Sequence, residues 1–431
     1  MPIWNAKEEC LDLEERAQQQ WERLQSTLNR AYKNVPFYRN RFDQQEIDLS
    51  RAESLNDLAR IPFTGREHFS ENYPYGLFAV PLRDVVRIHT AQGTGLRPVV
   101  SGYTRQDLQL WRELVARALS ASGVSSSDIL QIDLDPGLTN WGRDYKDGAE
   151  STGASVIPMT LLPLEKQLMV MRDYRTSVLV TTPSAAEQLA DLLFRSKVNP
   201  NELSLRTLIL VGESLKGPVQ SQLEEQLHVK TWVHYGLSEV PGPALAFECE
   251  ERRGLHVSED HFCVEVIDPA TGISVPDGEE GELVLTTLTT KAFPLIRFRT
   301  GDRVRLLAGP CHCGRTLRRM EWFSRRTDDM LIIRGVKINH HQILLLLERT
   351  LGFIPQSYRF AIRRRNFQDF LEVWVKVDEE IFSDEIKEME KLSRQLCSEL
   401  GQELGIPVQI RLKEGTSFDV AYQFNRLEDL R

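Results

Sequence analysis

The chain of 431 residues carries a formal net charge of −9, a balance that argues against nucleic acid as its main partner. Hydrophobic residues make up 41% and charged residues 27% of the sequence, as in ordinary globular proteins. No apolar run approaches the roughly 18 residues of a membrane span. The N-terminal segment also lacks the apolar stretch of a signal peptide. We therefore expect a cytoplasmic protein of about two or three domains, with no membrane segment.

Helical and extended patterns alternate along the first half of the chain. Helices are predicted over residues 8–32 (one or two helices, ended near Pro36), 105–122 (with Thr104 as N-cap), 144–152, 165–174, 184–196 and 217–227. Strands are predicted over residues 85–89, 99–104, 129–132, 154–157, 178–181, 205–211 and 232–233. Strands that alternate with helices of this length predict parallel pairing and a doubly wound α/β sheet.

The pattern changes to hairpins from about residue 244. Strands are predicted over residues 262–267, 281–287, 297–302 and 304–307, separated by turns rich in Gly and Pro. We expect a distorted antiparallel subdomain over 244–325, as the last part of an N-terminal domain covering residues 1–325. The remaining residues, 326–431, predict the order β–α–β–β–α–β of a small α+β domain after a polar linker.

The end of one predicted strand carries several chemically useful groups within five residues. Tyr235 can stack on a flat ring, and Gly236 allows a ligand to approach the backbone closely. Ser238 can bond an acyl or phosphate oxygen, and Glu239 can hold Mg²⁺ against phosphates. Ligands of open parallel sheets lie outside the carboxyl ends of the strands, where this segment is expected. The alternative is a strand followed by an ordinary turn.

The six cysteines do not suggest a disulfide framework in so long a chain. Cys249 and His256 flank a turn, and Cys311 and Cys313 flank His312. Three thiols and an imidazole can hold a tetrahedral Zn²⁺ in a closed structural site, with His312 as an alternative ligand. The competing interpretation is four unrelated residues. The other cysteines, Cys10, Cys263 and Cys397, are interpreted as packing residues.

The order of several longer motifs resembles the phenylacetate–CoA ligases, a family of the adenylate-forming acyl-activating superfamily. The resemblance covers nearly the whole chain. It includes Asn34-Val-Pro-Phe-Tyr-Arg39, Ile61-Pro-Phe-Thr64, Asn72-Tyr-Pro-Tyr-Gly76, Tyr235-Gly-Leu-Ser-Glu239, Gly278-Glu-Glu-Gly-Glu-Leu-Val284, Arg299-Thr-Gly-Asp302 and the segment Arg326–Gly335. It implies a large N-terminal domain with a small C-terminal lid. It also implies that a carboxylic acid reacts with ATP·Mg²⁺ to give acyl-AMP, after which the lid rotates and the coenzyme A thiol attacks.

The same resemblance implies roles for individual residues. The adenine would lie between Gly212, Glu213 and Ser214 on one side and Tyr235, Gly236, Leu237 and Ser238 on the other. Glu239 matches the carboxylate that holds Mg²⁺, and Asp302 matches the carboxylate that bonds both ribose hydroxyls. Arg326 and Asp328 match the linker and hinge of the lid. Asp328 alone is equally typical of a solvated loop.

The phosphate loop departs from the family pattern. Family members have Ser-Ser-Gly-Thr-Thr-Gly-Lys-Pro where this chain has Ala91-Gln-Gly-Thr-Gly-Leu-Arg-Pro98. Hydroxyls that would bond pyrophosphate are missing, and Leu96 replaces a glycine. Gly93, Thr94 and Arg97 remain candidates for contacting the phosphates, since a small-residue loop can point backbone N–H groups at an anion. A plain hairpin loop is the alternative.

The tail and the acyl pocket also depart from the pattern. Gln423 stands where the family has a Lys that contacts the acyl-AMP phosphate, and a neutral amide cannot supply that charge-assisted bond. Such a loss typically costs about 3–4 kcal/mol of transition-state stabilisation. Lys413 is a substitute only if it reaches the site. Asp133 and Asp135 would make the pocket more polar if they point inward, so we expect an acid other than phenylacetate.

Three functions remain open at this point. The first is a ligase that adenylates an aryl or other carboxylic acid and passes it to the thiol of CoA or of an acyl carrier protein, with Glu239, Asp302 and Gln423 at the catalytic positions. The second is an ATP-independent acyltransferase that uses an acyl-thioester donor. The third is a non-catalytic relative. The retained Tyr235–Glu239 segment, Asp302 and Arg326 favour a catalytic protein. The oligomeric state is open, with a homodimer among the alternatives.

Overall fold

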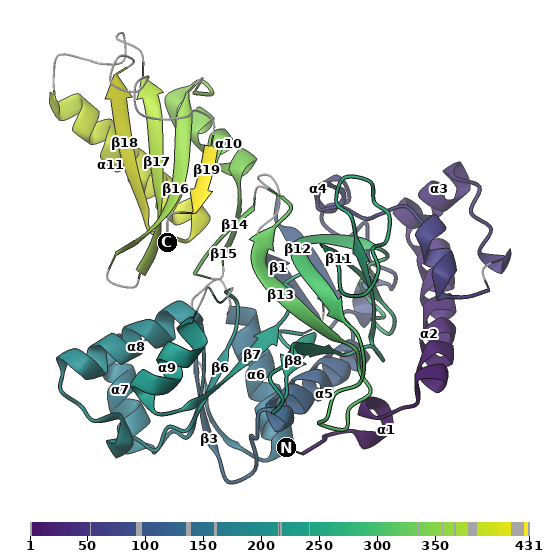
Figure 1. Ribbon diagram of the computed structural model, residues 1–431. Helices are drawn as coiled ribbons and strands as arrows, with labels where there is room; N and C mark the ends of the chain where they lie inside the picture. The colour runs from purple at the N-terminus through teal and green to yellow at the C-terminus, as the bar shows by residue number, and fades with distance from the viewer. Residues whose placement is uncertain are drawn as a thin grey trace.

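The computed structural model describes residues 2–51, 53–91, 97–134, 139–158, 162–213, 215, 218–240, 242–328, 330–334, 336–355, 357–365, 368–377, 386–414 and 426–429. Gly93, Thr94, Asp135, Ser214 and Gln423 therefore lie outside the described residues. Figure 1 shows a large part built from the N-terminal residues and a smaller part built from the C-terminal residues. The two parts meet near strands β14 and β15.

The predicted N-terminal helices are confirmed as α1 (Ala6–Glu9) and α2 (Leu13–Asn34). The side chain of Asp12 caps α2 by accepting a hydrogen bond from the backbone N–H of Glu14 at 2.8 Å. Pro36 does more than end α2, because it is the first residue of the unpredicted helix α3 (Pro36–Gln44). Proline suits this position, since its fixed φ matches a helix and its missing N–H would have no partner there.

A hairpin and a long helix follow the short helix α4 (Glu67–Glu71). Strands β1 (Arg87–Ala91) and β2 (Val99–Tyr103) pair in antiparallel fashion and form a separate two-stranded sheet. Helix α5 (Arg105–Ala121) begins at the predicted cap, where Thr104 Oγ1 accepts from the N–H of Asp107 at 3.2 Å. Asp107 Oδ2 accepts in return from the N–H of Thr104 at 2.8 Å, which completes a capping box.

The predicted strand–helix alternation forms a parallel half-sheet. In chain order its elements are β3 (Ile129–Asp133), α6 (Thr139–Thr152), β4 (Ser155–Ile157), α7 (Leu164–Asp173), β5 (Val178–Thr181), α8 (Pro183–Arg195), β6 (Thr207–Leu210), α9 (Val219–Leu227) and β7 (Lys230–Tyr235). Successive residues of β5 face opposite layers. Val178 and Val180 pack in the core with α5 and α6, whereas Leu179 packs with α7, α8 and α9. Helices thus cover both faces of the sheet (Figure 1).

The antiparallel region continues this sheet instead of forming a separate one. Its strands are β8 (Ala246–Glu248), β9 (Leu255–Val257), β10 (Phe262–Ile267), β11 (Glu280–Thr287), β12 (Phe298–Leu307) and β13 (Arg319–Arg326). Among the described residues the strands form one eleven-stranded sheet in the order β10-β11-β12-β13-β9-β8-β7-β6-β5-β3-β4. The two strands predicted at 297–302 and 304–307 are the single strand β12, which is irregular between Asp302 and Val304. The unpredicted strands are β8, β9 and β13.

The C-terminal part has its own sheet and core. It contains β14 (Met330–Ile333), β15 (Val336–Asn339), α10 (His340–Leu351), β16 (Tyr358–Arg365), β17 (Gln368–Val377), α11 (Ile386–Leu404), β18 (Val408–Glu414) and β19 (Arg426–Asp429). The sheet order is β18-β17-β16-β19, and β14 and β15 form a separate hairpin. Leu346, Phe360, Val373 and Leu400 pack in one apolar cluster between the sheet and the helices. The predicted order β–α–β–β–α–β is confirmed by β14, α10, β16, β17, α11 and β18, whereas β15 and β19 were not predicted.

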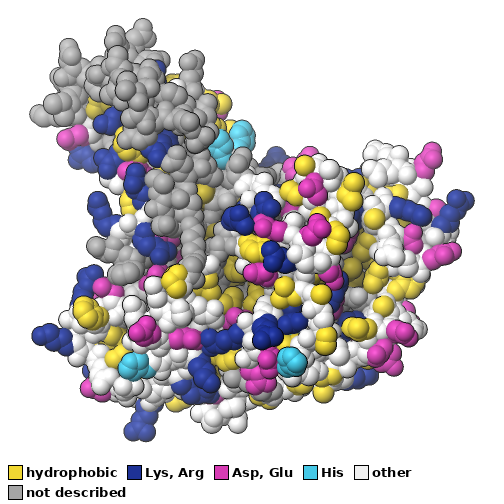
Figure 2. Space-filling model, in the orientation of Figure 1, with side chains coloured by type: hydrophobic (Ala, Val, Ile, Leu, Met, Phe, Trp, Pro, Cys, Tyr) yellow, Lys and Arg dark blue, Asp and Glu magenta, His cyan; other side chains and the backbone are white. Residues whose placement is uncertain are grey.

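The predicted fold class, α/β with a small α+β C-terminal part, is confirmed. The predicted boundary after residue 325 falls at the end of β13. Figure 2 shows acidic and basic side chains interspersed over the visible face of the larger part. Within the described residues, no helix has the length and apolar character needed to cross a membrane.

Candidate active site

Tyr235 is the last residue of β7 and is almost completely buried. Its hydroxyl donates a hydrogen bond to Asp302 Oδ2 at 2.7 Å. Its ring packs edge-on against the ring of Trp322, with centroids 5.0 Å apart. The strand tip therefore brings Tyr235 and Asp302 together, although 67 residues separate them in the sequence. Trp322 was not predicted as part of this group.

Gly236 is required by the path of the chain itself. A Cβ atom at this position would lie 2.5 Å from the carbonyl oxygen of Gly242 and 2.7 Å from backbone atoms of Pro243. The sequence suggested that this glycine admits a ligand, but the close neighbour in the structure is the backbone of the following turn. Leu237 is buried next to it, and Ser238 is partly exposed.

Glu239 is fully buried, and its carboxylate is bonded by two cations and a hydroxyl. Arg66 Nη1 bonds Oε1. Lys337 Nζ lies 3.0 Å from Oε1 and 2.7 Å from Oε2, and Ser238 Oγ donates to Oε2 at 3.2 Å. Burial alone would raise the pKa of Glu239, but the two cations outweigh it and hold this pKa well below its usual range. Burial lowers the pKa of Lys337 to about 8, against the opposing effect of Glu239.

Asp302 and the predicted hinge residues form a second ionic group. Arg326 Nη1 bonds Asp302 Oδ1, while Arg326 Nε and Nη2 bond the two oxygens of Asp328 at 2.7 and 2.8 Å. Arg326 Nη2 also donates to the carbonyl oxygen of Thr300 at 2.7 Å. Burial lowers the pKa of Arg326, but Asp302 and Asp328 outweigh burial and raise it above its ordinary value. The predicted hinge is thus bonded directly to the predicted ribose carboxylate.

The two ionic groups meet at one backbone carbonyl. Arg66 Nη2 donates to the oxygen of Thr300 at 3.3 Å, and this oxygen also accepts from Arg326. Glu239, Asp302 and their cations consequently lie around a common point near the end of β7. Carboxylates and cations that converge in this way can contact one ligand together, such as the phosphates and sugar of a nucleotide.

The segment predicted to line the adenine lies after β6. Gly212 has a φ of +77°, a conformation that favours glycine. The carboxylate of Glu213 bonds the start of α8, since Ser184 N and Oγ donate to it at 3.1 and 2.9 Å. A carboxylate at a helix N-terminus is stabilised by the helix dipole. Glu213 is therefore held in place by the protein itself.

The predicted phosphate loop lies between β1 and β2, which pair in antiparallel fashion, and its Gly93 and Thr94 lie outside the described residues. Arg97 is exposed, and its guanidinium lies over the ring of Tyr73 at 5.7 Å. Asp133 accepts a hydrogen bond from Gln167 Nε2 at 2.8 Å. Asp133 is thus neither a plain exposed acid nor a lone buried charge.

Sequence reasoning missed Arg66 and Lys337, the two cations on Glu239. Arg66 follows the motif Ile61-Pro-Phe-Thr64, and Lys337 follows the segment Arg326–Gly335, so each lies next to a motif that had been noticed. Lys413, which had been considered as a substitute cation, is exposed and lies over the Trp374 ring at 5.9 Å. Among the described residues, Lys337 is the lysine whose Nζ bonds Glu239.

The predicted metal ligands are brought together. One ligand atom from each of Cys249, His256, Cys311 and Cys313 lies within 4.8 Å of every other. The Sγ atoms of Cys249 and Cys311 are 3.6 Å apart, and Cys313 Sγ lies 3.3 Å from His256 Nε2. His256 Nδ1 lies 3.0 Å from the carbonyl oxygen of Leu317, which leaves Nε2 facing the thiols. His312 is exposed and does not belong to this cluster.

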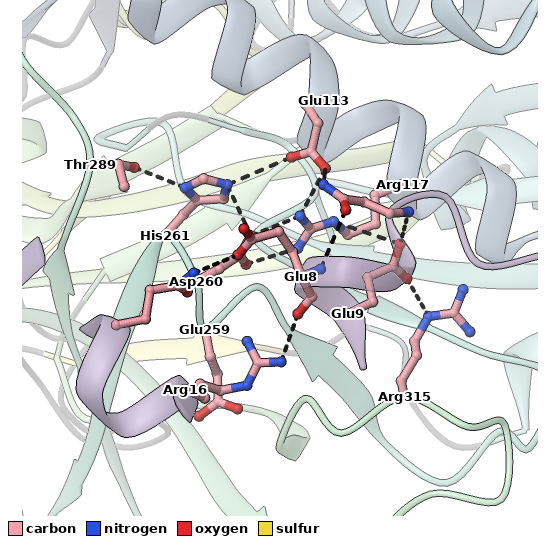
Figure 3. Close-up of polar contacts among 12 residues, drawn as sticks. Glu8, Glu9, Arg16, Glu113, Arg117, Glu259, Asp260, His261, Thr289 and Arg315 are labelled. Atoms are coloured by element: carbon pink, nitrogen blue, oxygen red, sulfur yellow. Dashed lines mark hydrogen bonds and ion pairs between the residues drawn. The ribbon is translucent and has the colours of Figure 1, made fainter. Parts of the chain in front are cut away.

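A buried ionic network surrounds Glu9 of helix α1 (Figure 3). Arg315, two residues after Cys313, bonds Glu9 Oε2 at 2.6 Å. Arg117 lies 4.0 Å from the other oxygen of Glu9, and its Nη1 and Nη2 bond both oxygens of Asp260 at 2.8 Å. The network fixes the N-terminal segment against α5 and the antiparallel strands. The acidic residues around His261 have the spacing of a cation site, but Arg117 already supplies a cation there.

Comparison with known proteins identifies the family. Residues 149–289 match the family described as AMP-binding enzyme, and residues 335–431 match the AMP-binding enzyme C-terminal domain. The phenylacetate-coenzyme A ligase of Thermus thermophilus is 39% identical over 406 residues, which cover 91% of both chains. The chain belongs to the phenylacetate–CoA ligase family. Family members from Pseudomonas putida and Escherichia coli are each 38% identical, over 92% and 91% of this chain and 90% of their own lengths. The predicted resemblance is confirmed, and the protein is an adenylate-forming acid–thiol ligase by homology.

Solved structures of one further ligase are similar in fold. A 2-hydroxyisobutyryl-CoA ligase, in complex with 2-HIB-AMP and CoA in the thioesterification state, has a TM-score of 0.90 at 25% identity, covering 98% of this chain and 91% of its own. The same ligase in its postadenylation state with 2-HIB-AMP has a TM-score of 0.70, covering 99% and 92%. Both structures are of the same ligase, so the two TM-scores differ because the parts of that ligase are arranged differently in its two states.

Proposed function

We propose that this protein joins a carboxylic acid to the thiol of coenzyme A through an acyl-AMP intermediate. The observation that carries the proposal is the convergence of Tyr235, Glu239 and Asp302 at the tip of β7, in a member of the phenylacetate–CoA ligase family. The acid is bound as a carboxylate, and one of its oxygens attacks the α-phosphorus of ATP. Pyrophosphate departs as the leaving group, and acyl-AMP is formed. The CoA thiol then attacks the acyl carbon, and AMP leaves as the thioester forms.

Asp302 is proposed to hold the ribose of the nucleotide. A carboxylate has about four lone-pair sites. Asp302 uses one on each oxygen, for Arg326 and Tyr235, so each oxygen retains the capacity to accept a ribose hydroxyl. Arg326 is proposed to couple nucleotide binding to the position of the lid, because its guanidinium bonds both Asp302 and the hinge residue Asp328. Gly212 and Glu213 are proposed to border the adenine opposite Tyr235.

The arrangement of the C-terminal part supports a protein in its thioester-forming state. The higher TM-score with the ligase in its thioesterification state than with its postadenylation state carries this proposal. In this arrangement Glu239 does not fit the magnesium ion that the family implies, because both of its oxygens are already bonded by Arg66 and Lys337.

The acid is proposed to be aryl or otherwise compact, and to differ from phenylacetate. Asp133 is the last residue of β3, at the edge where the parallel strands end, and it is held by Gln167. Asp133 is half-buried, and such a carboxylate beside the acyl group would favour a substrate with a hydrogen-bond donor away from its acid group, because hydrogen bonds stabilise the charged carboxylate.

The cysteine cluster is proposed to hold a structural zinc ion. Three sulfur atoms and one imidazole nitrogen match the ligand set of closed zinc sites, and the second nitrogen of His256 is directed by a backbone carbonyl, as is typical of metal-ligating histidines. Arg315 places a positive charge beside Cys313, which would offset the net negative charge of a three-thiolate zinc site. Zinc would then fasten the turn at 310–314 to β8 and β9.

The test is a pair of half-reaction assays on the full-length protein with a panel of aryl and aliphatic acids. Thioester formation measured with ATP, Mg²⁺ and CoA is expected for at least one acid, together with acid-dependent exchange of pyrophosphate into ATP. The matched variant is Gln423→Lys, which is expected to raise exchange by about 10²–10³ if the missing cation limits adenylation.

Other outcomes would change the assignment. Exchange in Gln423→Lys but not in the natural protein would mean that adenylation has been lost. Acyl transfer from a thioester donor without ATP, with no exchange in either protein, would favour the acyltransferase. The absence of all three activities would favour a non-catalytic relative.

A further inference from the structure

Glu239 is bonded from both parts of the molecule. Arg66 and Ser238 belong to the larger part, whereas Lys337 lies on β15 of the C-terminal hairpin. Figure 1 places this hairpin at the junction of the two parts, close to the end of β7. Lys337 contacts both carboxylate oxygens, and its side chain is only 11% exposed. This contact is therefore a nearly dry ion pair between the two parts.

The carboxylate of Glu239 has no remaining lone-pair site. Its Oε1 accepts from Arg66 and Lys337, and its Oε2 accepts from Lys337 and Ser238. A carboxylate offers about four such sites, so all are used. Asp302, by contrast, accepts one bond on each oxygen from Arg326 and Tyr235. The two acids of the site thus differ in their capacity to take a further ligand.

From this difference we infer that Lys337 and a divalent cation exclude one another at Glu239. The inference rests on the proposed function, which supplies the reason for a cation to approach this carboxylate. A magnesium ion coordinates oxygen lone pairs directly and keeps several of its waters. Neither requirement is met while the Lys337 ammonium lies within 3.0 Å of both oxygens. Binding of a metal ion at Glu239 therefore requires the β14–β15 hairpin to move away from this carboxylate.

Lys337 is accordingly a positioning residue for the C-terminal part. While a divalent cation occupies Glu239, repulsion between the cation and the ammonium disfavours the arrangement described here. Once the cation leaves, Lys337 neutralises the buried carboxylate and stabilises this arrangement. By linkage, a bound metal destabilises this arrangement by the same free energy by which the arrangement weakens metal binding at Glu239.

The test measures binding of Mn²⁺, a paramagnetic probe for a magnesium site, by the loss of its free-ion electron spin resonance signal. Lys337→Met removes the ammonium and keeps much of the side chain. This variant is expected to bind one Mn²⁺ about tenfold more tightly than the natural protein, since the competing internal cation is gone. The gain must disappear in the double variant Lys337→Met/Glu239→Gln, which identifies Glu239 as the ligand.

Two control variants separate competition from general loosening. Lys337→Arg keeps a positive charge and is expected to bind Mn²⁺ no more tightly than the natural protein. Arg364→Gln removes a second ion pair between the parts, in which Nη1 lies 2.7 Å from Glu187 Oε2 on α8, and it leaves Lys337 in place. A tenfold gain in Arg364→Gln, or no gain in Lys337→Met, would overturn the inference.

Amide hydrogen exchange on the natural protein gives an independent readout. Addition of Mg²⁺ alone is expected to increase exchange in β15 (Val336–Asn339), because the hairpin must detach. Unchanged exchange at saturating Mg²⁺ would count against exclusion. Neither experiment contains acid or CoA, so their outcomes are separate from that of the ligase assay. The exclusion can therefore be tested even in a protein that is inactive as a ligase.

Discussion

Arg326 lies directly opposite Asp302 across the β12–β13 strand pair, and its guanidinium bonds the Asp302 carboxylate. Arg326 is also the last residue of β13, so the segment that leads to the C-terminal part begins at this ion pair. Gly301 lies beneath it, where a Cβ atom would be 2.4 Å from both Arg326 Nη2 and Asp328 Oδ2. The proposed ribose carboxylate and the proposed hinge are therefore one packed unit.

Gly301→Ala should lower the free energy of unfolding by more than the strain of a left-handed alanine alone. Gly301 and Gly309 both have a φ of +79°, but a Cβ at Gly309 would meet nothing within 4 Å. Gly309→Ala is expected to lower the free energy of unfolding by about 1–2 kcal/mol, the usual cost of a left-handed alanine. Gly301→Ala should cost about 1–3 kcal/mol more because of overpacking. Urea titration of both variants measures the difference, and equal losses would contradict the packing role.

Zinc content should depend on the four clustered ligands. The purified protein is expected to contain about one zinc ion per chain, and Cys249→Ser is expected to lose most of it. The matched control is Cys263→Ala, which alters a buried cysteine outside the cluster. Metal analysis by mass spectrometry checks both, with thermal melting to follow the stability. A natural protein without zinc would refute the site, and so would equal loss in both variants.

Arg117 should be among the most costly charges to remove. It is fully buried and bonds both oxygens of Asp260, itself buried, in the network of Figure 3. Arg117→Met would leave Asp260 without this cation, and breaking such a buried pair typically costs about 3–5 kcal/mol. Arg195→Met serves as the control, because Arg195 bonds Asp191 on the surface of α8 and should contribute little. Urea unfolding of the two variants tests this contrast; similar stabilities would contradict it.

The pH dependence of stability should contain a contribution from His261. Burial lowers the pKa of His261, but Asp260 and Glu113 outweigh burial and raise it above 6.5, while Arg117 opposes them. The hydroxyl of Thr289 faces its other nitrogen. Since the folded pKa is the higher one, this stabilisation is complete below about pH 6.5 and is lost as pH rises through the folded value.

His261→Gln should therefore remove part of the decline in stability above pH 6.5. The measurement is the free energy of unfolding of the natural protein and the variant from pH 6 to pH 9. The two curves should converge toward high pH, because the variant lacks the proton that the natural protein loses. Curves that stay parallel would mean that His261 does not titrate in this range.

The sequence was most informative where local pattern decides structure. Thr104 caps α5 as predicted, because its hydroxyl and Asp107 are only three residues apart. The strands and helices from β3 to β7 follow from alternating apolar runs. The four cysteine-cluster residues were recognised because their side-chain types are typical of metal ligands.

The contacts that the sequence could not reveal join residues far apart in the chain. Arg66 and Lys337 lie 173 and 98 residues from Glu239, and nothing in their local sequence specifies that partner. Strands β8 and β9 have three residues each, too few for a periodic pattern. Gly236 was interpreted as an opening for a ligand, but the neighbour that requires it, the backbone at Gly242 and Pro243, is known only from the folded chain.

Strand β7 pairs with β6 in parallel and with β8 in antiparallel fashion. An inserted or deleted residue within it would slip its alignment with both neighbours at once and turn Tyr235 away from Asp302. Repair by a compensating change in one neighbour would leave the other mismatched. Variation in length among functional relatives should thus be confined to the connections on either side of β7. The spacing from Lys230 to Tyr235 should be constant, so it gives a reference for aligning the sequences of these relatives.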